Sequence, residues 1–404
     1  MKINSQRFLR TLVELSQFGA VPEGGVSRLC LAPEEVNAKK YVFNLMKEAG
    51  LKARFDQVAN VIGILDNDSN SIVCAGSHVD SVMNGGRLDG NYGVLGAIEA
   101  VRTMKESNLK LKHSLMIVSF TNEEGIRFPP MTGSKFMVGE MTLEEIYTMR
   151  DSSGASFKDL IKASGLETSS SIQNTKSFNS FVELHIEQGP ILEYEKKKIG
   201  LVQSIVGIMQ FNVTIEGSSD HAGTTPMSMR KDALIASSLF ILRIKDLANE
   251  VGGGAVGTVG KLDVLPGAPN VIPGKVNFTV DFRHSSADTL HSCKQKIESI
   301  ADSISKETGM RISISPRAYL APASMSTRIM DTIEKSIGDL NLSYKKMHSG
   351  AGHDTMTMRK ITETGMIFVP SRGGKSHSAL EATDPEDLVN GANVLLNTLV
   401  RLAT

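Results

Sequence analysis

Five residues of the kinds that bind metal ions occur in or just after short apolar runs of this 404-residue chain. The runs lie in SIVCAGSHVDS, LMIVSFTNEEG, SFVELHIEQG and GMIFVPSRGGKSH, and their Val, Ile and Phe content is typical of buried strands. Ligands of an open α/β sheet bind in the crevice at the carboxyl ends of its strands. Two carboxylates and three imidazoles that meet there predict a metal site, and with it a hydrolase. The candidates are His78, Asp89, Glu124, His185 and His377.

The pair His78 and Asp80 has the spacing of a metal ligand and its support. Residues i and i+2 of a strand point the same way. His78 can therefore bind a metal ion while the Asp80 carboxylate accepts the other ring N–H of His78 and fixes its tautomer. Taken alone, such a pair is more often a surface turn with a structural aspartate. The metal hypothesis therefore depends on the other candidates.

Acidic residues supply the remaining chemistry. The carboxylate of Asp89 has two oxygens, so it can bridge two metal ions. Glu123 and Glu124 are adjacent, and their side chains diverge, so Glu124 can bind metal while Glu123 faces the water as a general base. With Asp89 shared, the five ligands divide three to each metal ion. This ligand set predicts two divalent ions per subunit, zinc first, with manganese or cobalt as alternatives.

The composition excludes several other classes of protein. Lys and Arg together number 44, as do Asp and Glu, and the isoelectric point is about 7.1, so we expect no nucleic-acid partner. Three cysteines without CxxC spacing are typical of a reducing cytosol. The N-terminal residues show a helical pattern capped by Asn4 or Ser5 rather than a signal peptide, and no apolar run is long enough to span a bilayer. We therefore expect a cytoplasmic protein without a membrane partner.

The first half of the chain alternates short apolar strands with helical stretches. Strand patterns at 72–76 and 115–120 flank a helical pattern at 93–104. This alternation predicts a mostly parallel sheet covered by helices, which is the architecture of an α/β domain. The same kind of pattern resumes near Ala321 and continues to the C-terminus.

The segment at 209–320 has a different pattern. FNVTIEG and KVNFTVDFRH alternate apolar and polar residues, as a sheet with one exposed face does. Helical patterns at 232–251 and 288–307 separate such strands. We therefore predict an inserted α+β domain at 209–320, between the two parts of a catalytic domain at 1–208 and 321–404.

Longer motifs occur in one order along nearly the whole chain: GSHVDSVMNGGRLDG, TNEEGIRF, ELHIEQGPILE, DHAGTTPM, PNVIPGKVNFTVDFRH, HSGAGHD and SRGGKSH. They resemble motifs of the amidase (hydantoinase/carbamoylase) branch of the dinuclear zinc aminoacylase–carboxypeptidase family. The resemblance implies a zinc-peptidase-like α/β catalytic domain with an inserted α+β lid. The lid is implied to form a homodimer as well.

The resemblance also implies a role for each candidate residue. Glu123 is implied to be the general base. His221, in DHAGTTPM, is implied to stabilise the oxyanion from the partner subunit, a common electrostatic use of an imidazole. Asn270 and Arg283 would hold the substrate carboxylate, and Gln188 would contact the ureido group. The implied ligands of the two metal ions are, in turn, His78, Asp89 and His185, and Asp89, Glu124 and His377.

The position of Arg283 agrees with this role on independent grounds. Arg283 ends the alternating strand VNFTVDFR, so its side chain shares a face with Thr279 and Asp281 and points away from Phe282. A planar guanidinium can hold a carboxylate through two hydrogen bonds. Taken alone, such an arginine is as often part of a surface salt bridge.

Two further positions bear on the choice of substrate. HSGAGHD, which contains Gly352, and DFRH resemble the allantoate-cleaving members of the family more than the carbamoylases. Gln210 stands where the resemblance leads us to expect arginine. Gln210 could recognise a second ureido group or a different side chain.

These observations predict a dinuclear amidohydrolase that cleaves the ureido C–N bond of a small carboxylate and releases ammonia and carbon dioxide. Allantoate is the expected substrate, with N-carbamoyl-L-amino acids or N-carbamoyl-β-alanine as alternatives. A further alternative is an aminoacylase or dipeptidase, although DHAGTTP with the Asn270 and Arg283 pair fits short ureido acids better. A non-catalytic binding module would not need Glu123 as a general base.

Overall fold

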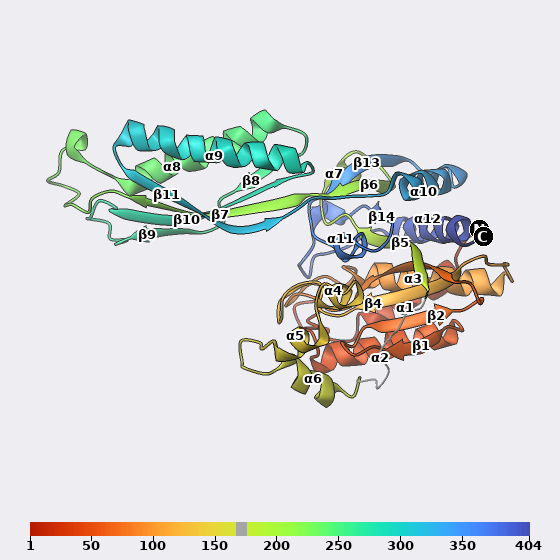
Figure 1. The fold of residues 1–404 in the computed structure, drawn as a ribbon. Coiled ribbons are helices and arrows are strands. Elements are labelled where there is room, and N and C mark those ends of the chain that lie inside the picture. Colours follow the sequence, from red (N-terminus) through yellow and green to blue (C-terminus); the bar gives the residue numbers. More distant parts are fainter. Residues whose placement is uncertain (167–175) are drawn as a thin grey trace. The chain divides into compact units, whose positions relative to one another are not determined.

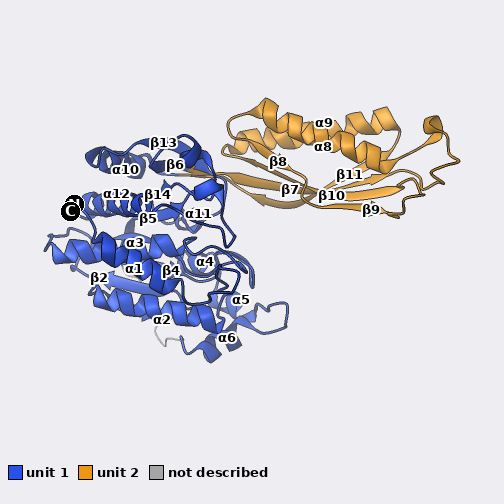
Figure 2. Ribbon diagram, turned by 180° about the vertical axis from the view of Figure 1, so that it is seen from behind, with its two compact units in different colours: residues 1–203, 325–404 blue, residues 204–324 orange. Residues whose placement is uncertain are grey.

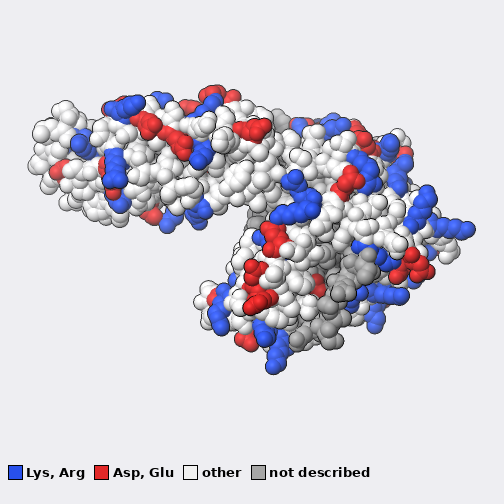
Figure 3. Space-filling model, in the orientation of Figure 1, with Lys and Arg blue, Asp and Glu red and all other residues white. Residues whose placement is uncertain are grey.

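The computed structural model describes the chain except for residues 167–175. The chain forms two compact units, one made of Met1–Gln203 and Met325–Thr404 and the other of Ser204–Ser324 (Figure 2). The insertion predicted at 209–320 begins and ends a few residues inside the bounds of this second unit. On the face shown in Figure 3, acidic and basic side chains are interspersed over each unit. None of the described helices is long and apolar enough to cross a membrane.

The larger sheet is mixed, with parallel strands only at its centre (Figure 1). Its strands are β1 (Lys52–Phe55), β2 (Val61–Leu65), β3 (Ser71–His78), β4 (Ser114–Phe120), β5 (Ser177–Ile186), β6 (Ile199–Ile205), β12 (Ala323–Ser324), β13 (Tyr344–Ser349) and β14 (Thr364–Val369). They run in the order β1-β2-β4-β3-β5-β14-β6-β12, and β13 also pairs with β6. Strands β4, β3, β5 and β14 are parallel neighbours, whereas β1, β2 and β6 pair antiparallel. The predicted parallel sheet is therefore correct for the centre and wrong for the flanks.

Helices cover both faces of this sheet, which confirms the α/β class. One face is covered by α1 (Ser5–Leu15), α2 (Pro33–Glu48), α3 (Asn91–Glu106), α10 (Thr327–Asp339) and α12 (Pro385–Ala403), and the other by α4 (Thr132–Met137) and α11 (Thr355–Met358). In β3, Val73 and Ala75 join the first layer of the core and Ile72 and Cys74 join the second. Successive side chains of a strand point to opposite faces, so a strand buried on both faces reads as a continuous apolar run.

The second unit contains a separate antiparallel sheet covered by helices on one face (Figure 1). Its elements are β7 (Gly207–Glu216), α8 (Ala233–Val251), β8 (Val256–Thr258), β9 (Leu262–Leu265), β10 (Lys275–His284), α9 (Ala287–Thr308) and β11 (Arg311–Leu320). The strand order is β11-β7-β10-β8, and β9 also pairs with β10. Every second residue of β10 is buried against the helices, among them Phe278 and Phe282, which confirms the predicted alternation.

Candidate metal centre

The five predicted metal ligands lie around the carboxyl ends of the central strands. His78 is the last residue of β3, and His185 is the last but one of β5. Glu124 follows β4, and His377 follows β14 after the short 3-10 helix η2 (Arg372–Gly374). Asp89 comes just before α3. Since β3, β4, β5 and β14 are parallel, their carboxyl ends share one edge of the sheet, as the sequence pattern predicts.

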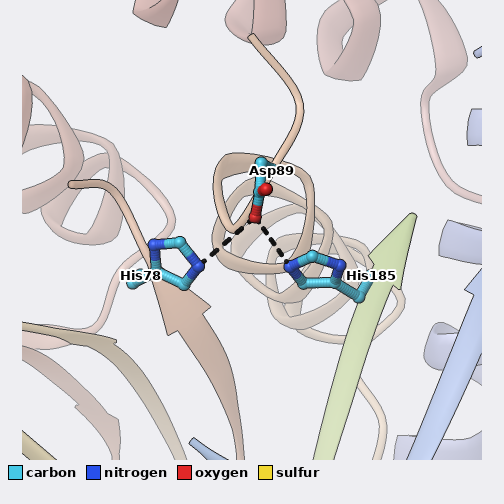
Figure 4. Close-up of side chains that lie close together, drawn as sticks. All are labelled: His78, Asp89 and His185. Carbon is cyan, nitrogen blue, oxygen red and sulfur yellow. Dashed lines mark ion pairs between the residues drawn. The ribbon is translucent and has the colours of Figure 1, made fainter. Parts of the chain in front are cut away.

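Asp89 lies at the centre of this group. Its Oδ1 is 3.5 Å from His78 Nε2 and 3.2 Å from His185 Nε2, and Figure 4 shows both imidazoles pointing at it. Its Oδ2 is 3.3 Å from His377 Nε2, which in turn lies 3.3 Å from Glu124 Oε2. The potential ligand atoms thus form two sets of three, and within each set they lie within 4.8 Å of one another. Asp89 belongs to both sets and turns one oxygen to each.

The charges of the site fit a pair of divalent cations. Burial, followed by the charge of Asp89, raises the pKa of Glu124 to about 7. Burial also raises the pKa of Glu123 well above its usual range. For Asp89 burial works in the same direction, but hydrogen bonds from the three histidines hold its pKa well below the usual range. Carboxylates crowded away from water need nearby positive charge to stay ionised. Two divalent ions would supply it, and the mixed imidazole and carboxylate donors suit zinc-like metals.

Asp80 supports the site differently from what we predict from its spacing. His78 Nδ1 lies 3.0 Å from the backbone oxygen of Asp80, whereas the nearest Asp80 carboxylate oxygen is 3.7 Å away. The carboxylate instead accepts the backbone N–H groups of Glu123 and Glu124, at 3.2 and 3.1 Å. The chain leaves strand conformation directly after His78, so the alternation on which the prediction relied no longer applies. Asp80 therefore fixes His78 through its carbonyl and the two glutamates through its side chain.

Glu123 is beside the metal ligands without belonging to either set of three. Its Oε2 lies 3.7 Å from His78 Nε2, and the residue is 8% exposed. The backbone hydrogen bond to Asp80 holds it next to Glu124. Glu123 thus lies close to the candidate ligand sets without belonging to either, and its role as general base stays a prediction.

Gln188 and Gly352 also lie in the first unit. Gln188 Nε2 donates to Asp89 Oδ2 at 2.7 Å and to Ser376 Oγ at 3.3 Å, so the amide contacts the shared carboxylate. Gly352 lies between β13 and α11, and a Cβ there would come within 2.9 Å of the Met131 side chain. Position 352 therefore leaves little room for any side chain larger than that of glycine. Contacts of either residue with a substrate stay predictions.

Sequence reasoning missed Glu381, which holds the loop that carries Asp89. The Glu381 carboxylate accepts the backbone N–H groups of Leu88 and Asp89, at 2.8 and 3.1 Å, and the Ser376 hydroxyl at 2.8 Å. A Cβ at Gly86 would lie 1.8 Å from the carboxyl carbon of Glu381, so only glycine leaves room for it. In the sequence, Glu381 is an acid in a polar loop, and no periodicity distinguishes it from a solvated one.

Removal of the Glu381 carboxylate should weaken metal binding. In a Glu381→Ala variant, two backbone donors beside Asp89 lose their acceptor, and the position of the shared ligand becomes less defined. Residues that orient metal ligands in this way typically change metal affinity by about 10- to 100-fold. Titration of metal-free protein with zinc, followed by calorimetry, measures the change. Glu363→Ala, which removes an exposed acid paired with Arg328, is the control, and equal affinity in the two variants would contradict the role given to Glu381.

Sequence reasoning also missed Arg28, which lies beneath the end of β3. Its guanidinium is fully buried, and Nε donates to the backbone oxygen of Val79 at 2.7 Å. Its backbone N–H donates to Ser81 Oγ at 2.9 Å. Burial lowers the pKa of Arg28 to about 10, against the raising effect of the Asp80 charge. Arg28 therefore forms hydrogen bonds with the residues before and after Asp80, and its guanidinium keeps a positive charge near the Asp80 carboxylate.

Gly90 keeps space for the His78 ring. Its φ is +66°, and a Cβ would lie 2.5 Å from atoms of the imidazole. Gly165 has the same φ of +66°, with nothing within 4 Å of its would-be Cβ. Gly165→Ala should therefore lose about 1–2 kcal/mol of folding free energy from its left-handed backbone. Gly90→Ala should lose at least as much, because its ψ of −48° lies outside the left-handed helical region. Only Gly90→Ala should displace His78 and lower metal affinity, by about 10-fold or more. Zinc titration of both variants checks this, and a matching loss in Gly165→Ala would refute the steric explanation.

The remaining predicted residues form two pairs in the second unit. Gln210 Nε2 donates to Asp281 Oδ2 at 2.7 Å, and Arg283 Nε donates to Asp281 Oδ1 at 2.8 Å. These side chains share the sheet face that the helices leave uncovered, as the alternation of Arg283 predicts. His221 and Asn270 lie in adjoining loops, because the N–H of Ala222 donates to the oxygen of Asn270 at 3.0 Å. The structure thus links Gln210 to Arg283 through Asp281, and brings the loops of His221 and Asn270 together.

Known proteins resemble the chain over its whole length. N-carbamoyl-L-amino-acid amidohydrolase of Paenarthrobacter aurescens is 37% identical over 408 residues, which cover 99% of this chain and 98% of that protein. Allantoate amidohydrolase of Escherichia coli (strain K12) is 37% identical over 402 residues and 98% of each chain. Ureidoglycolate hydrolase of Arabidopsis thaliana is 37% identical over 403 residues, 96% of this chain and 85% of that protein.

Family models and solved structures agree with these relatives. The model of peptidase family M20/M25/M40 matches residues 74–401. The crystal structure of an amidase of the hydantoinase/carbamoylase family from Burkholderia multivorans superposes with a TM-score of 0.95 at 33% identity, covering 100% of this chain and 98% of that chain. The family resemblance of the sequence motifs is thereby confirmed. With its two sets of potential metal ligands, this chain belongs to peptidase family M20/M25/M40 and, within it, to the metal-dependent amidohydrolases of the hydantoinase/carbamoylase type.

Proposed function

We propose that this protein cleaves the ureido C–N bond of a small carboxylate, with allantoate as the first candidate and two divalent ions, zinc first, at the metal centre. The observation that carries the proposal is the pair of ligand sets that share Asp89, with Glu123 beside them. Manganese and cobalt are the alternative metals. A cytoplasmic location, expected from the composition, belongs to the same proposal.

The side chains of the first unit suit this hydrolysis. Ions held by the two ligand sets would polarise the ureido carbonyl and lower the pKa of water. Glu123 takes a proton from the attacking water as its oxygen bonds to the ureido carbon. Glu123 then returns that proton to the leaving nitrogen, so that the C–N bond breaks and ammonia departs, and the remaining carbamate loses carbon dioxide. Burial raises the pKa of Glu123 well above its usual range, which makes its carboxylate a stronger base for the first of these transfers.

Arg283 and His221 lie at opposite ends of the small sheet, and we propose that they act on different substrate molecules. Six residues of extended strand, roughly 20 Å, separate Lys275 from Asp281 in β10. Arg283 lies beyond Asp281, whereas His221 and Asn270 belong to the loops at the other end. One small substrate cannot span this distance. In a homodimer, His221 would therefore act on the partner's substrate, and Asn270 would accompany it rather than share a carboxylate with Arg283 of its own subunit.

An apolar surface of the second unit supports the homodimer. On α8, Ile235 is 51% and Leu242 is 56% exposed, and on the short strands Val256, Leu262 and Leu265 are 52%, 42% and 47% exposed. Large apolar side chains gathered on one element and its neighbouring sheet edge commonly mark protein interfaces. The free edge formed by β8 and β9 would be covered in such a dimer.

The candidate substrates are those of relatives that resemble this chain to the same degree. Relatives that act on N-carbamoyl-L-amino acids, allantoate and ureidoglycolate are each 37% identical to this chain, so overall identity does not separate them. The HSGAGHD motif with Gly352 favours allantoate. Gln210, held by Asp281 on the same face as Arg283, can recognise a neutral ureido group by hydrogen bonds. N-carbamoyl-L-amino acids and N-carbamoyl-β-alanine are the alternatives, followed by acylated amino acids or dipeptides.

Arg283→Ala should lower kcat/KM by about 10- to 100-fold for carboxylated substrates, because a charged hydrogen-bonded pair contributes about 1.5–3 kcal/mol. The loss should be small for a substrate whose carboxylate is replaced by a carboxamide. Steady-state ammonia release with an N-carbamoyl amino acid and its amide gives both values. Arg311→Ala, on the exposed strand β11 of the same unit, is the matched control. Equal losses with acid and amide would exclude Arg283 from carboxylate binding.

A further inference from the structure

A pocket of about 410 Å³ lies in the second unit, between α9 and the end of β11. Figure 1 shows α9 passing over this side of the sheet. The strand pairing shifts register between Pro316 and Ala318, so Arg317 has no partner residue on β7. Residues of β11 beyond this bulge are all exposed, whereas Ile312 and Ile314 before it pack into the core. The bulge thus turns β11 away from the helix and opens the pocket.

The pocket is apolar at its base. Met209, Gln210 and Phe211 of β7 form part of the lining. Met209 and Phe211 are otherwise buried, at 5% and 2% exposure, whereas the Gln210 side chain is held by Asp281 on the face that the helices leave uncovered. Tyr319 and Pro316 of β11 form a side wall, and Tyr319 is 60% exposed. The volume lies within the usual range for pockets that bind small molecules. An aromatic or branched body of a ligand would bury these surfaces.

The rim of the pocket is positively charged. Lys294 and His291 of α9 and Arg317 of β11 line it, and no acidic residue does. The acid nearest to Lys294 is Glu298, at 3.9 Å, and both side chains are about half exposed, so this pair neutralises little. Within the described part of the chain, neither Arg317 nor His291 has an ion pair. Arg317, and Lys294 with only a weak pairing to Glu298, lie above an apolar base and suit a ligand with an apolar body and an anionic group.

We propose that this pocket is a second binding site, which takes a small aromatic anion. The ring would pack on Met209, Phe211 and Tyr319, and a carboxylate or sulfonate would bind Arg317 and Lys294. The site differs from the metal centre in chemistry. It has no metal ligand set, and its base is apolar, whereas the ureido acids proposed above are small and polar.

Two fluorescent probes with nearly the same ring system test the proposal with the full-length, metal-loaded protein. The anion is 8-anilinonaphthalene-1-sulfonate, and its neutral counterpart is N-phenyl-1-naphthylamine. We expect one saturable site per chain, at which the anion binds at least about 10-fold more tightly. Arg317→Gln should lower the affinity for the anion by about 10-fold and leave the affinity for the neutral probe unchanged. Ala318→Phe, which fills the pocket from an exposed position of β11, should abolish binding of both probes.

Lys306→Gln, at the far end of α9, is the matched control and should bind both probes like the unmodified protein. Thermal unfolding of each variant establishes that the fold is kept. The proposal is overturned if no saturable site is found, if both probes bind equally, or if Ala318→Phe binds the anion with unchanged affinity. It is also overturned if Lys306→Gln lowers the affinity for the anion as much as Arg317→Gln does.

Discussion

Glu123→Gln is expected to lower kcat by about 10²- to 10⁴-fold, the usual contribution of a general base, while both metal ions stay bound. Glutamine has nearly the shape of glutamate but cannot take the proton of the attacking water. The backbone hydrogen bond from Glu123 to Asp80 does not involve the substituted side chain, so Glu124 should keep its place. Ammonia release gives kcat, and elemental analysis of the dialysed protein gives the metal content.

The adjacent residue provides a matched comparison for this result. Glu124→Gln makes the same chemical change one position away, but Glu124 belongs to the set with Asp89 and His377. This variant should lose most of one metal ion per chain, whereas Glu123→Gln should lose none. If Glu123→Gln kept near-normal turnover, or if the two variants lost metal equally, the division of roles between the two glutamates would be wrong.

Asp89→Ala is expected to remove both metal ions and to lower activity by more than about 10³-fold, since bound metal ions contribute several kcal/mol of transition-state stabilisation. Asp89 turns one oxygen to His78 and His185 and the other to His377, so its loss affects both ligand sets at once. Metal content and ammonia release are again the measurements. Asp339→Ala, which removes an exposed aspartate paired with Arg401, should change neither. Retention of two ions per chain in Asp89→Ala would contradict the shared position of Asp89.

The metal ligands could be predicted from the sequence because strand periodicity is local. His78 and His185 end apolar runs that are buried on both faces, and parallel strands bring such ends together whatever lies between them. Their supports could not be predicted. Glu381 reaches Asp89 across almost three hundred residues of chain, and Arg28 reaches Val79 from the N-terminal part. Contacts of this kind depend on loop conformation, which leaves no periodic pattern in the sequence.

The same distinction applies to the fold. Alternation of strands and helices predicts the parallel centre of the large sheet, because a parallel pair needs a long crossover connection. The antiparallel flank of β1 and β2 depends instead on the short turn between these strands, which the sequence pattern does not reveal. In the second unit, alternation correctly places Arg283 on the uncovered face. The pairing of Asn270 with His221 comes from two loops, and only the structure reveals it.

The central claim is that this chain is a metal-dependent hydrolase of ureido acids. Its most direct test is ammonia release by metal-free protein reloaded with zinc, manganese or cobalt. The substrates are allantoate, N-carbamoyl-L-amino acids, N-carbamoyl-β-alanine and ureidoglycolate, with an N-acetyl amino acid and a dipeptide assayed for free amine. We predict metal-dependent ammonia release from the ureido acids, fastest with allantoate, and little cleavage of the last two. Absence of ammonia from every ureido acid with all three metals, or faster cleavage of the acylated amino acid or dipeptide, would contradict the claim.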